Sequence, residues 1–224
     1  YLVNKVRPDE VQWYAKVERV VVPQERRAQH LKNPLYAYYI SDIFIPEQEV
    51  SASTVDTDVR KDPMKMYRLM TEVEARHPDP ESETGFDQEA ANEDMQAMHC
   101  WCHSHPFTAS PSPSGQDDVM FREWIFENQI AQKMDTPMVA LIFGSGEKIH
   151  ARVYDPRVPG VMFDNVDVHI EYDESFDTTY IDEAVKNKIK KKQWSKLKSS
   201  GSYVRGPDGV YRKKNNKEVK RIKI

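Results

Sequence analysis

The sequence predicts a mixed α/β protein, in which a mostly antiparallel, curved sheet is flanked by helices in three layers. Three observations predict this class. Residues 8–22 alternate between apolar and polar side chains, as a half-buried strand does. Residues 138–143 (MVALIF) form a short apolar run, typical of a buried strand. Apolar residues recur at helical spacing after positions 62 and 114, so helices are expected to cover the sheet.

The length and composition favour one domain with an appendage. The chain has 224 residues, of which 39% are hydrophobic and 30% charged, and it contains 14 prolines. No apolar run approaches the roughly 20 residues that span a bilayer, and the first residues do not form a signal-peptide pattern. Only two cysteines occur, Cys100 and Cys102, which favours a reducing setting. We therefore expect an intracellular, cytoplasmic protein without a membrane segment.

The net charge of −4 hides an asymmetry between the body and the tail. Residues 181–224 hold 15 Lys plus Arg and 4 Asp plus Glu, whereas residues 1–180 hold 17 and 32. We expect a domain over residues 1–172 and a basic helical extension and tail over residues 173–224. The tail could dock on the acidic body, bind an acidic partner or nucleic acid, or be a solvated tether. Three aromatic residues among its basic ones permit nucleic-acid contact without requiring it: Trp194, Tyr203 and Tyr211.

The first half of the chain predicts strands and then helices. Residues 8–22 should form one or two strands and residues 24–34 a polar turn. Residues 35–46 are rich in aromatic and β-branched side chains, so they predict a central strand. Residues 47–58 predict an irregular edge or a further strand. After residue 58 the sequence predicts a helix that begins at Asp62-Pro63, since Asp can cap a helix and Pro is tolerated in the first turn.

An acidic loop and a short strand come next. Residues 76–94 contain few apolar side chains and predict a mobile loop leading into a short helix. Residues 98–102 predict the strand that delivers the histidines. Residues 106–113 predict a rigid extended loop, because three prolines fix the backbone there.

The remaining elements follow the same patterns. A helix should start near Ser114 and end near Met134, and residues 138–143 and 148–154 should form a hairpin. Residues 161–172 predict another strand and residues 181–192 a basic helix. Residues 199–202 and 206–209 predict linker and turn. The first of these helices should bury four large side chains: Met120, Phe121, Trp124 and Ile125.

The segment from His99 to His105 carries the candidate chemistry. Alternation along a strand places four residues on one side: His99, Trp101, His103 and His105. The last two imidazoles can therefore converge on one metal ion, and with a nearby carboxylate they form a set that suits an open, catalytic zinc site. The other two are expected to be structural or supporting. The neighbouring cysteines could be metal ligands, but small buried residues on the core face are the favoured interpretation.

The segment Ser114-x-x-Asp117 has two compatible interpretations. At a helix start it has the form of a capping box, in which Ser114 accepts a hydrogen bond from the first turn. It could also border a functional site, since a helix N-terminus near a bound anion or oxyanion helps to stabilise negative charge. The residues alone favour capping.

These residues together resemble a known family. The run His103-Ser104-His105-Pro106, then Ser114-x-x-Asp117, with Glu10 on an early strand, is similar to the JAMM (MPN-plus) zinc metalloprotease motif. The resemblance covers roughly residues 5–172 and is strongest to prokaryotic and phage-type members. It implies the cytidine-deaminase-like, three-layer MPN fold. The family spacer between the second His and the Ser is usually seven residues and here it is eight, so Asp118 is the alternative third ligand.

The resemblance also implies roles for the residues. His103, His105 and Asp117 would bind Zn²⁺ and leave its fourth position for water. Glu10 would act as the general base, although by its pattern alone it reads as a solvent-facing strand residue. Ser114 would stabilise the oxyanion.

The implied activity is hydrolysis of a peptide or isopeptide bond. The substrate would be a protein or peptide, such as a ubiquitin-like conjugate or a precursor polypeptide. The alternative is an MPN-fold scaffold or protein-binding subunit with an idle metal site. The resemblance implies neither an oligomeric state nor an activating partner.

Overall fold

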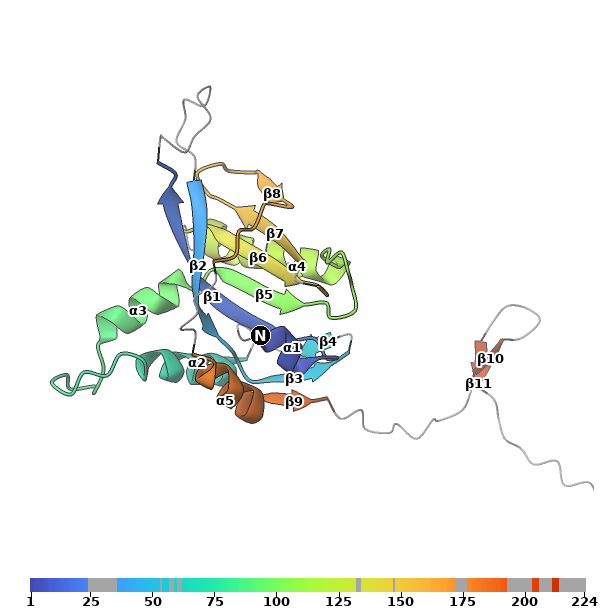
Figure 1. Cartoon of the computed structure of the whole chain (residues 1–224), viewed down its shortest axis with the longest axis horizontal. Coiled ribbons are helices and arrows are strands. Elements are labelled where there is room, and N and C mark those ends of the chain that lie inside the picture. Colours follow the sequence, from blue (N-terminus) through green and yellow to red (C-terminus); the bar gives the residue numbers. More distant parts are fainter. Residues whose placement is uncertain are drawn as a thin grey trace, which may run out of the picture. The chain divides into compact units, whose positions relative to one another are not determined.

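Six strands form the main sheet of the molecule, which a computed structural model describes for residues 1–23, 36–52, 54–56, 59, 62–131, 134–146, 148–171, 177–192, 203–205 and 211–213. The strand order is β2-β1-β5-β6-β7-β8 (Figure 1). The strands are β1 (Gln12–Val21), β2 (Tyr36–Phe44), β5 (Cys100–Ser104), β6 (Met138–Phe143), β7 (Ile149–Tyr154) and β8 (Met162–Asp164). Only β5 and β6 pair in parallel; the other neighbours are antiparallel. The expected mixed α/β class with a mostly antiparallel sheet is confirmed.

Helices cover both faces of this sheet. The helices are α1 (Leu2–Val6), α2 (Pro63–Glu74), α3 (Gln88–Ala97), α4 (Gly115–Ile125), a π-helix (Phe126–Ala131) and α5 (Thr179–Lys188). One core cluster joins α1 and α5 to one face of the sheet, and a second cluster joins α2, α3 and α4 to the other face. Successive residues of β1 alternate between the clusters, because side chains of a strand point to opposite faces. Thus Trp13 and Ala15 lie in the first cluster, and Tyr14 lies in the second.

A second, three-stranded sheet lies at the start of β1. Its order is β4 (Thr54–Asp56), β3 (Gln48–Ser51) and β9 (Ile189–Lys191), with β3 antiparallel to β4 and parallel to β9. The expectation of a further strand within residues 47–58 is therefore confirmed. The chain leaves this sheet at Asp56 and returns to it at Ile189, directly after α5. Figure 1 shows α5 leading into β9.

Chain contacts divide the molecule into two units, Tyr1–Lys191 and Lys192–Ile224. The first unit extends beyond residue 172, where the domain was expected to end, because Ile181 and Ala184 are buried in its core. The second unit contains a hairpin of β10 (Tyr203–Arg205) and β11 (Tyr211–Lys213). No helix of the described residues is both long and apolar enough to cross a membrane.

Several expectations about elements need correction. Residues 35–46 were expected to be central, but β2 is an edge strand, and Tyr39 is 54% exposed. Aromatic and β-branched residues favour a pleated strand without specifying its place in the sheet. The strand expected over 161–172 is only the three residues of β8. The helix expected over 181–192 begins at Thr179 and ends at Lys188, where the chain enters β9.

Other boundaries agree more closely. Asp62 caps α2 by accepting hydrogen bonds from the amides of Met64 and Lys65, as the Asp-Pro start predicts. Residues 88–97 form the short helix α3 after the acidic loop. The helix expected to run to Met134 is regular to Ile125 and continues as the π-helix to Ala131. The segments 24–34, 199–202 and 206–209, and Trp194, lie outside the described residues.

A buried ion pair fastens β7 to β1 and β2. Asp155 is 1% exposed and accepts hydrogen bonds from Arg19 Nε at 2.9 Å and Nη2 at 2.7 Å. Tyr38 Oη and the amide of Arg157 each donate to it at 2.9 Å. Burial alone would raise the pKa of Asp155, but these hydrogen bonds and the guanidinium of Arg19 outweigh burial and lower it. Asp155 therefore links the end of β7 to β1 and β2 as a charged carboxylate.

Candidate metal centre

Strand β5 delivers the two histidines to one face of the sheet. His103 is the fourth residue of β5, and His105 follows the strand, with its amide donating to the carbonyl of Phe143 at 2.8 Å. The Trp101 and His103 rings stack with centroids 4.5 Å apart. The expected alternation is confirmed, since Cys100 and Cys102 lie in the core cluster on the opposite face.

Asp117 lies in the first turn of α4, where it forms the capping box that the sequence predicts. Ser114 is the N-cap: its Oγ accepts from the amide of Asp117 at 3.2 Å, and its own amide donates to Asp117 Oδ2 at 2.6 Å. The cap fixes the Asp117 side chain in the first turn. Because the Ser114 hydroxyl accepts this bond, its own proton is left to donate elsewhere.

The proline-rich loop between His105 and Ser114 is held against the β6–β7 turn. The amide of Ser145 donates to the carbonyl of Thr108 at 2.9 Å. Gly144 allows this close approach, because a Cβ at that position would lie 2.5 Å from the Thr108 carbonyl oxygen and 2.8 Å from Pro111. The eight-residue spacer is thus accommodated in the loop.

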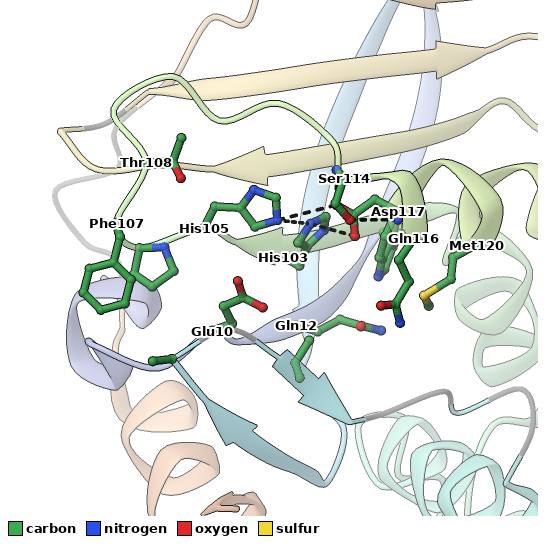
Figure 2. Close-up of a pocket in the computed structure, with 14 residues that line it drawn as sticks. Glu10, Gln12, His103, His105, Phe107, Thr108, Ser114, Gln116, Asp117 and Met120 are labelled. Atoms are coloured by element: carbon green, nitrogen blue, oxygen red, sulfur yellow. Dashed lines mark hydrogen bonds and ion pairs between the residues drawn. The ribbon is translucent and has the colours of Figure 1, made fainter. Parts of the chain in front are cut away.

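Three ligand atoms converge at this site (Figure 2). His103 Nε2 and His105 Nε2 are 3.2 Å apart; His103 Nε2 lies 3.4 Å from Asp117 Oδ1, and His105 Nε2 lies 3.5 Å from the other oxygen, Oδ2. One ligand atom of each residue lies within 4.8 Å of the other two. Tetrahedral coordination at bond lengths of about 2.0–2.2 Å separates ligand atoms by about 3.3–3.6 Å. The two imidazoles and the carboxylate lie close enough together to hold a zinc ion and to leave one of its positions open.

Asp118 does not reach this site. Its carboxylate pairs with Arg152 of β7, which also pairs with Asp164 of β8. Asp117 and Asp118 therefore have different partners. Asp117 lies beside the two histidines, whereas Asp118 links the start of α4 to the sheet through Arg152. The geometry favours Asp117 as the third ligand and not the alternative, Asp118.

Glu10 lies across the pocket from this triad, just before β1. It is half-buried, and Figure 2 shows its carboxylate directed toward His103 and His105. Burial raises the pKa of Glu10, the charge of His105 opposes the shift, and Asp117 adds to it. A carboxylate with a raised pKa beside a candidate metal site suits a general base. The interpretation of Glu10 as a solvent-facing strand residue is not supported by this placement.

The triad and Glu10 line one pocket of about 360 Å³. Phe107 borders it on one side, and Gln12, Gln116 and Met120 border it on the other (Figure 2). Ser114 also lines the pocket. All five residues of the resemblance are thus brought to one pocket, although Glu10 and Asp117 are more than 100 positions apart.

The charges of the triad depend on one another. Burial lowers the pKa of His103, and Asp117 opposes this shift. For His105 the carboxylate of Asp117 is the largest influence and raises the pKa. Burial alone would raise the pKa of Asp117, but the two imidazoles outweigh it and hold that pKa well below the usual range.

The other candidate residues in and beside β5 are buried in the core and do not lie at the candidate metal site. Cys100 and Cys102 are fully buried, unbridged, and have Sγ atoms 3.4 Å apart. His99 is 3% exposed and contacts Met138 Sδ through Nδ1 at 3.3 Å. Burial lowers the pKa of His99 to about 4, so it is neutral at pH 7. None of the three joins the triad.

Two buried residues near the site were given no role by sequence reasoning, Ser104 and Gln48. Ser104 is 0% exposed, and its Oγ accepts from the amide of Val11 at 3.0 Å. Its amide donates to the carbonyl of Val11 at 2.9 Å. Ser104 belongs to the His-Ser-His run that the sequence presents, whereas no local pattern marks Gln48.

Replacing Ser104 by alanine is expected to destabilise the protein by about 1–3 kcal/mol, because the buried amide of Val11 would lose its acceptor. Urea unfolding of the variant measures this change. Ser112→Ala, in the exposed part of the loop, is the matched control and should stay within about 0.5 kcal/mol of the wild type. Equal stabilities of the two variants would show that the Ser104 hydroxyl is not needed.

Comparison with models of known protein families found no match, and neither did a search of curated proteins.

Proposed function

We propose that this protein is a zinc-dependent metallopeptidase that hydrolyses a peptide or isopeptide bond, with the MPN fold and JAMM-type chemistry that its motif resembles. One observation carries the proposal: His103, His105 and Asp117 bring one ligand atom each within 4.8 Å of one another, in a pocket that also holds Glu10. The signature passes from a central strand through a loop into a helix start, which supports the same family.

The residues divide the work as follows. His103, His105 and Asp117 would hold the metal ion. When bound, zinc supplies Lewis acidity that polarises a carbonyl group and lowers the pKa of water to about 7. Glu10 would accept a proton from the attacking water at its carboxylate and donate it to the leaving amine. The hydroxyl of Ser114 would donate a hydrogen bond to the oxyanion of the tetrahedral intermediate.

The substrate we propose is a protein or peptide, such as a ubiquitin-like conjugate or a precursor polypeptide. The open position of the metal site and the adjacent pocket of about 360 Å³ suit a chain segment better than a whole domain. Among the described residues that line the pocket there is no Lys or Arg, and their titratable groups are carboxylates and imidazoles. A neutral or basic segment would therefore be accepted more readily than an acidic one.

Metal analysis tests this proposal. Protein purified without chelator is expected to carry about one zinc ion per chain, and His103→Ala should lose it, since two remaining ligands rarely hold zinc. His169→Ala is the control, because His169 is exposed and far from the triad in sequence. A zinc content well below one per chain that His103→Ala does not change would contradict the proposal. Full zinc loading without hydrolysis of any peptide conjugate would favour the scaffold alternative.

A further inference from the structure

The segment that carries Glu10 runs between two sheets and is hydrogen-bonded alternately to each. The backbone of Val11 bonds to Ser104 of β5, the strand that bears the histidines. On the other side, the amide of Glu10 donates to the carbonyl of Ser51, at the end of β3, at 2.8 Å. The position of Glu10 relative to His105 therefore depends on both strands.

Gln48 of β3 makes the next contact along this segment, with its side chain in place of a backbone group. Its Oε1 accepts from the amide of Gln12 at 2.9 Å, and its Nε2 donates to the carbonyl of Gln12 at 2.8 Å. Nε2 also lies 3.2 Å from the carbonyl of Pro46. A carboxamide has one acceptor and two donors on a planar group, so it can pair with a peptide group as another peptide would.

The Gln48 side chain is 3% exposed, so these hydrogen bonds are shielded from water. A buried amide or carbonyl that loses its partner costs about 1–3 kcal/mol, and the chain would move to avoid this. Replacing the carboxamide is therefore expected to shift the segment from Glu10 to Gln12.

Strand β3 pairs in turn with β9, the last strand of the first unit in the sequence. Gln48, Glu49 and Val50 pair in parallel with the residues of β9. Lys191, the last residue of β9, lies 3.3 Å from a carboxylate oxygen of Asp9, which precedes Glu10. The second sheet thus contacts the Glu10 segment at three successive points, through Asp9, Glu10 and Gln12.

We propose that Gln48 is a positioning residue for the general base: its carboxamide clamps the Gln12 peptide groups and so holds Glu10 facing His105. This proposal rests on the proposed function, in which Glu10 is the base. The hydrogen bonds of Gln48 go to Gln12 and Pro46, whereas the residues of the triad come from β5, its following loop and α4. Loss of Gln48 should therefore slow the reaction without removing the metal.

Gln48→Met tests the proposal, because methionine has a similar length and lacks both hydrogen-bonding groups. We expect kcat for hydrolysis of a peptide conjugate to fall by about tenfold or more, since small misplacements of a catalytic group are costly, with KM changed little. Zinc content should remain about one per chain. Amide hydrogen exchange of Gln12 should become faster. Glu49→Met, on the exposed neighbour in the same strand, should leave all four measurements as in the wild type.

A second variant covers the case in which methionine prevents folding. Gln48→Glu keeps an acceptor for the Gln12 amide and loses at least one of the two N–H donors to the Gln12 and Pro46 carbonyls, so a fall in kcat in the same direction is expected. Folded variants with zinc and a kcat within twofold of the wild type would overturn the proposal, as would unchanged exchange at Gln12. If the wild type binds no zinc or hydrolyses nothing, the proposed function fails, and the exchange measurement alone then decides whether Gln48 holds the segment.

Discussion

Replacing Glu10 by glutamine is expected to lower kcat for peptide hydrolysis by about 10²–10⁴-fold while leaving about one zinc ion per chain. Glutamine has nearly the same shape and cannot accept the proton of the attacking water. Glu10 supplies none of the three ligand atoms that converge at the site, so zinc content should be kept. Steady-state kinetics together with metal analysis of the same sample measures both quantities.

A matched substitution separates this role from a general effect of removing a charge. Glu49→Gln removes a carboxylate from an exposed position of β3 and should keep wild-type turnover. Full activity of Glu10→Gln would show that another group is the base. Loss of zinc from Glu10→Gln would instead show that Glu10 helps to hold the metal.

The largest effect on stability is expected for Asp155→Ala, at about 3–5 kcal/mol of the free energy of unfolding. The substitution leaves the guanidinium of Arg19, whose side chain is 9% exposed, without its buried counter-charge. It also removes the acceptor for Tyr38 Oη and for the amide of Arg157. Urea unfolding at pH 7, followed by circular dichroism, measures the loss.

The control and the pH dependence make this prediction specific. Asp135→Ala removes a carboxylate that is 71% exposed and 3.9 Å from the same Arg19, so it should cost no more than about 1 kcal/mol. The folded state lowers the pKa of Asp155, so its contribution is complete above the unfolded pKa of about 3.9 and is lost as the pH falls through the lower, folded pKa. The gap between wild type and Asp155→Ala should therefore narrow below about pH 4. A gap that does not depend on pH would show that the ion pair is not its cause.

Much of the fold could be predicted because its signals are local. The period-two alternation of β1, the Asp62 cap of α2 and the Ser114 capping box each depend on a few neighbouring residues. The place of β2 at the edge of the sheet could not be predicted in this way, because strand order is set by pairing between distant segments. The short β8 and the switch from α5 to β9 are likewise decided by tertiary contacts.

The same distinction applies to the site. His103 and His105 could be selected from alternation, and Asp117 from its spacing to Ser114, but the choice between Asp117 and Asp118 needed the contact of Asp118 with Arg152. Glu10 could be selected only through the resemblance, since its surroundings come from three separate parts of the chain. Gln48 has no local signal, because its partners are the backbone of a segment 36 positions away.

The hydrogen bond from the Ser114 amide to Asp117 Oδ2 gives the carboxylate two tasks, since it caps α4 and is also a proposed metal ligand. A ligand that binds only the folded state stabilises that state in proportion to the logarithm of its free concentration. Metal capture and the formation of the first turn of α4 would then be one linked equilibrium. The free energy of unfolding would then rise with the concentration of free zinc around the protein.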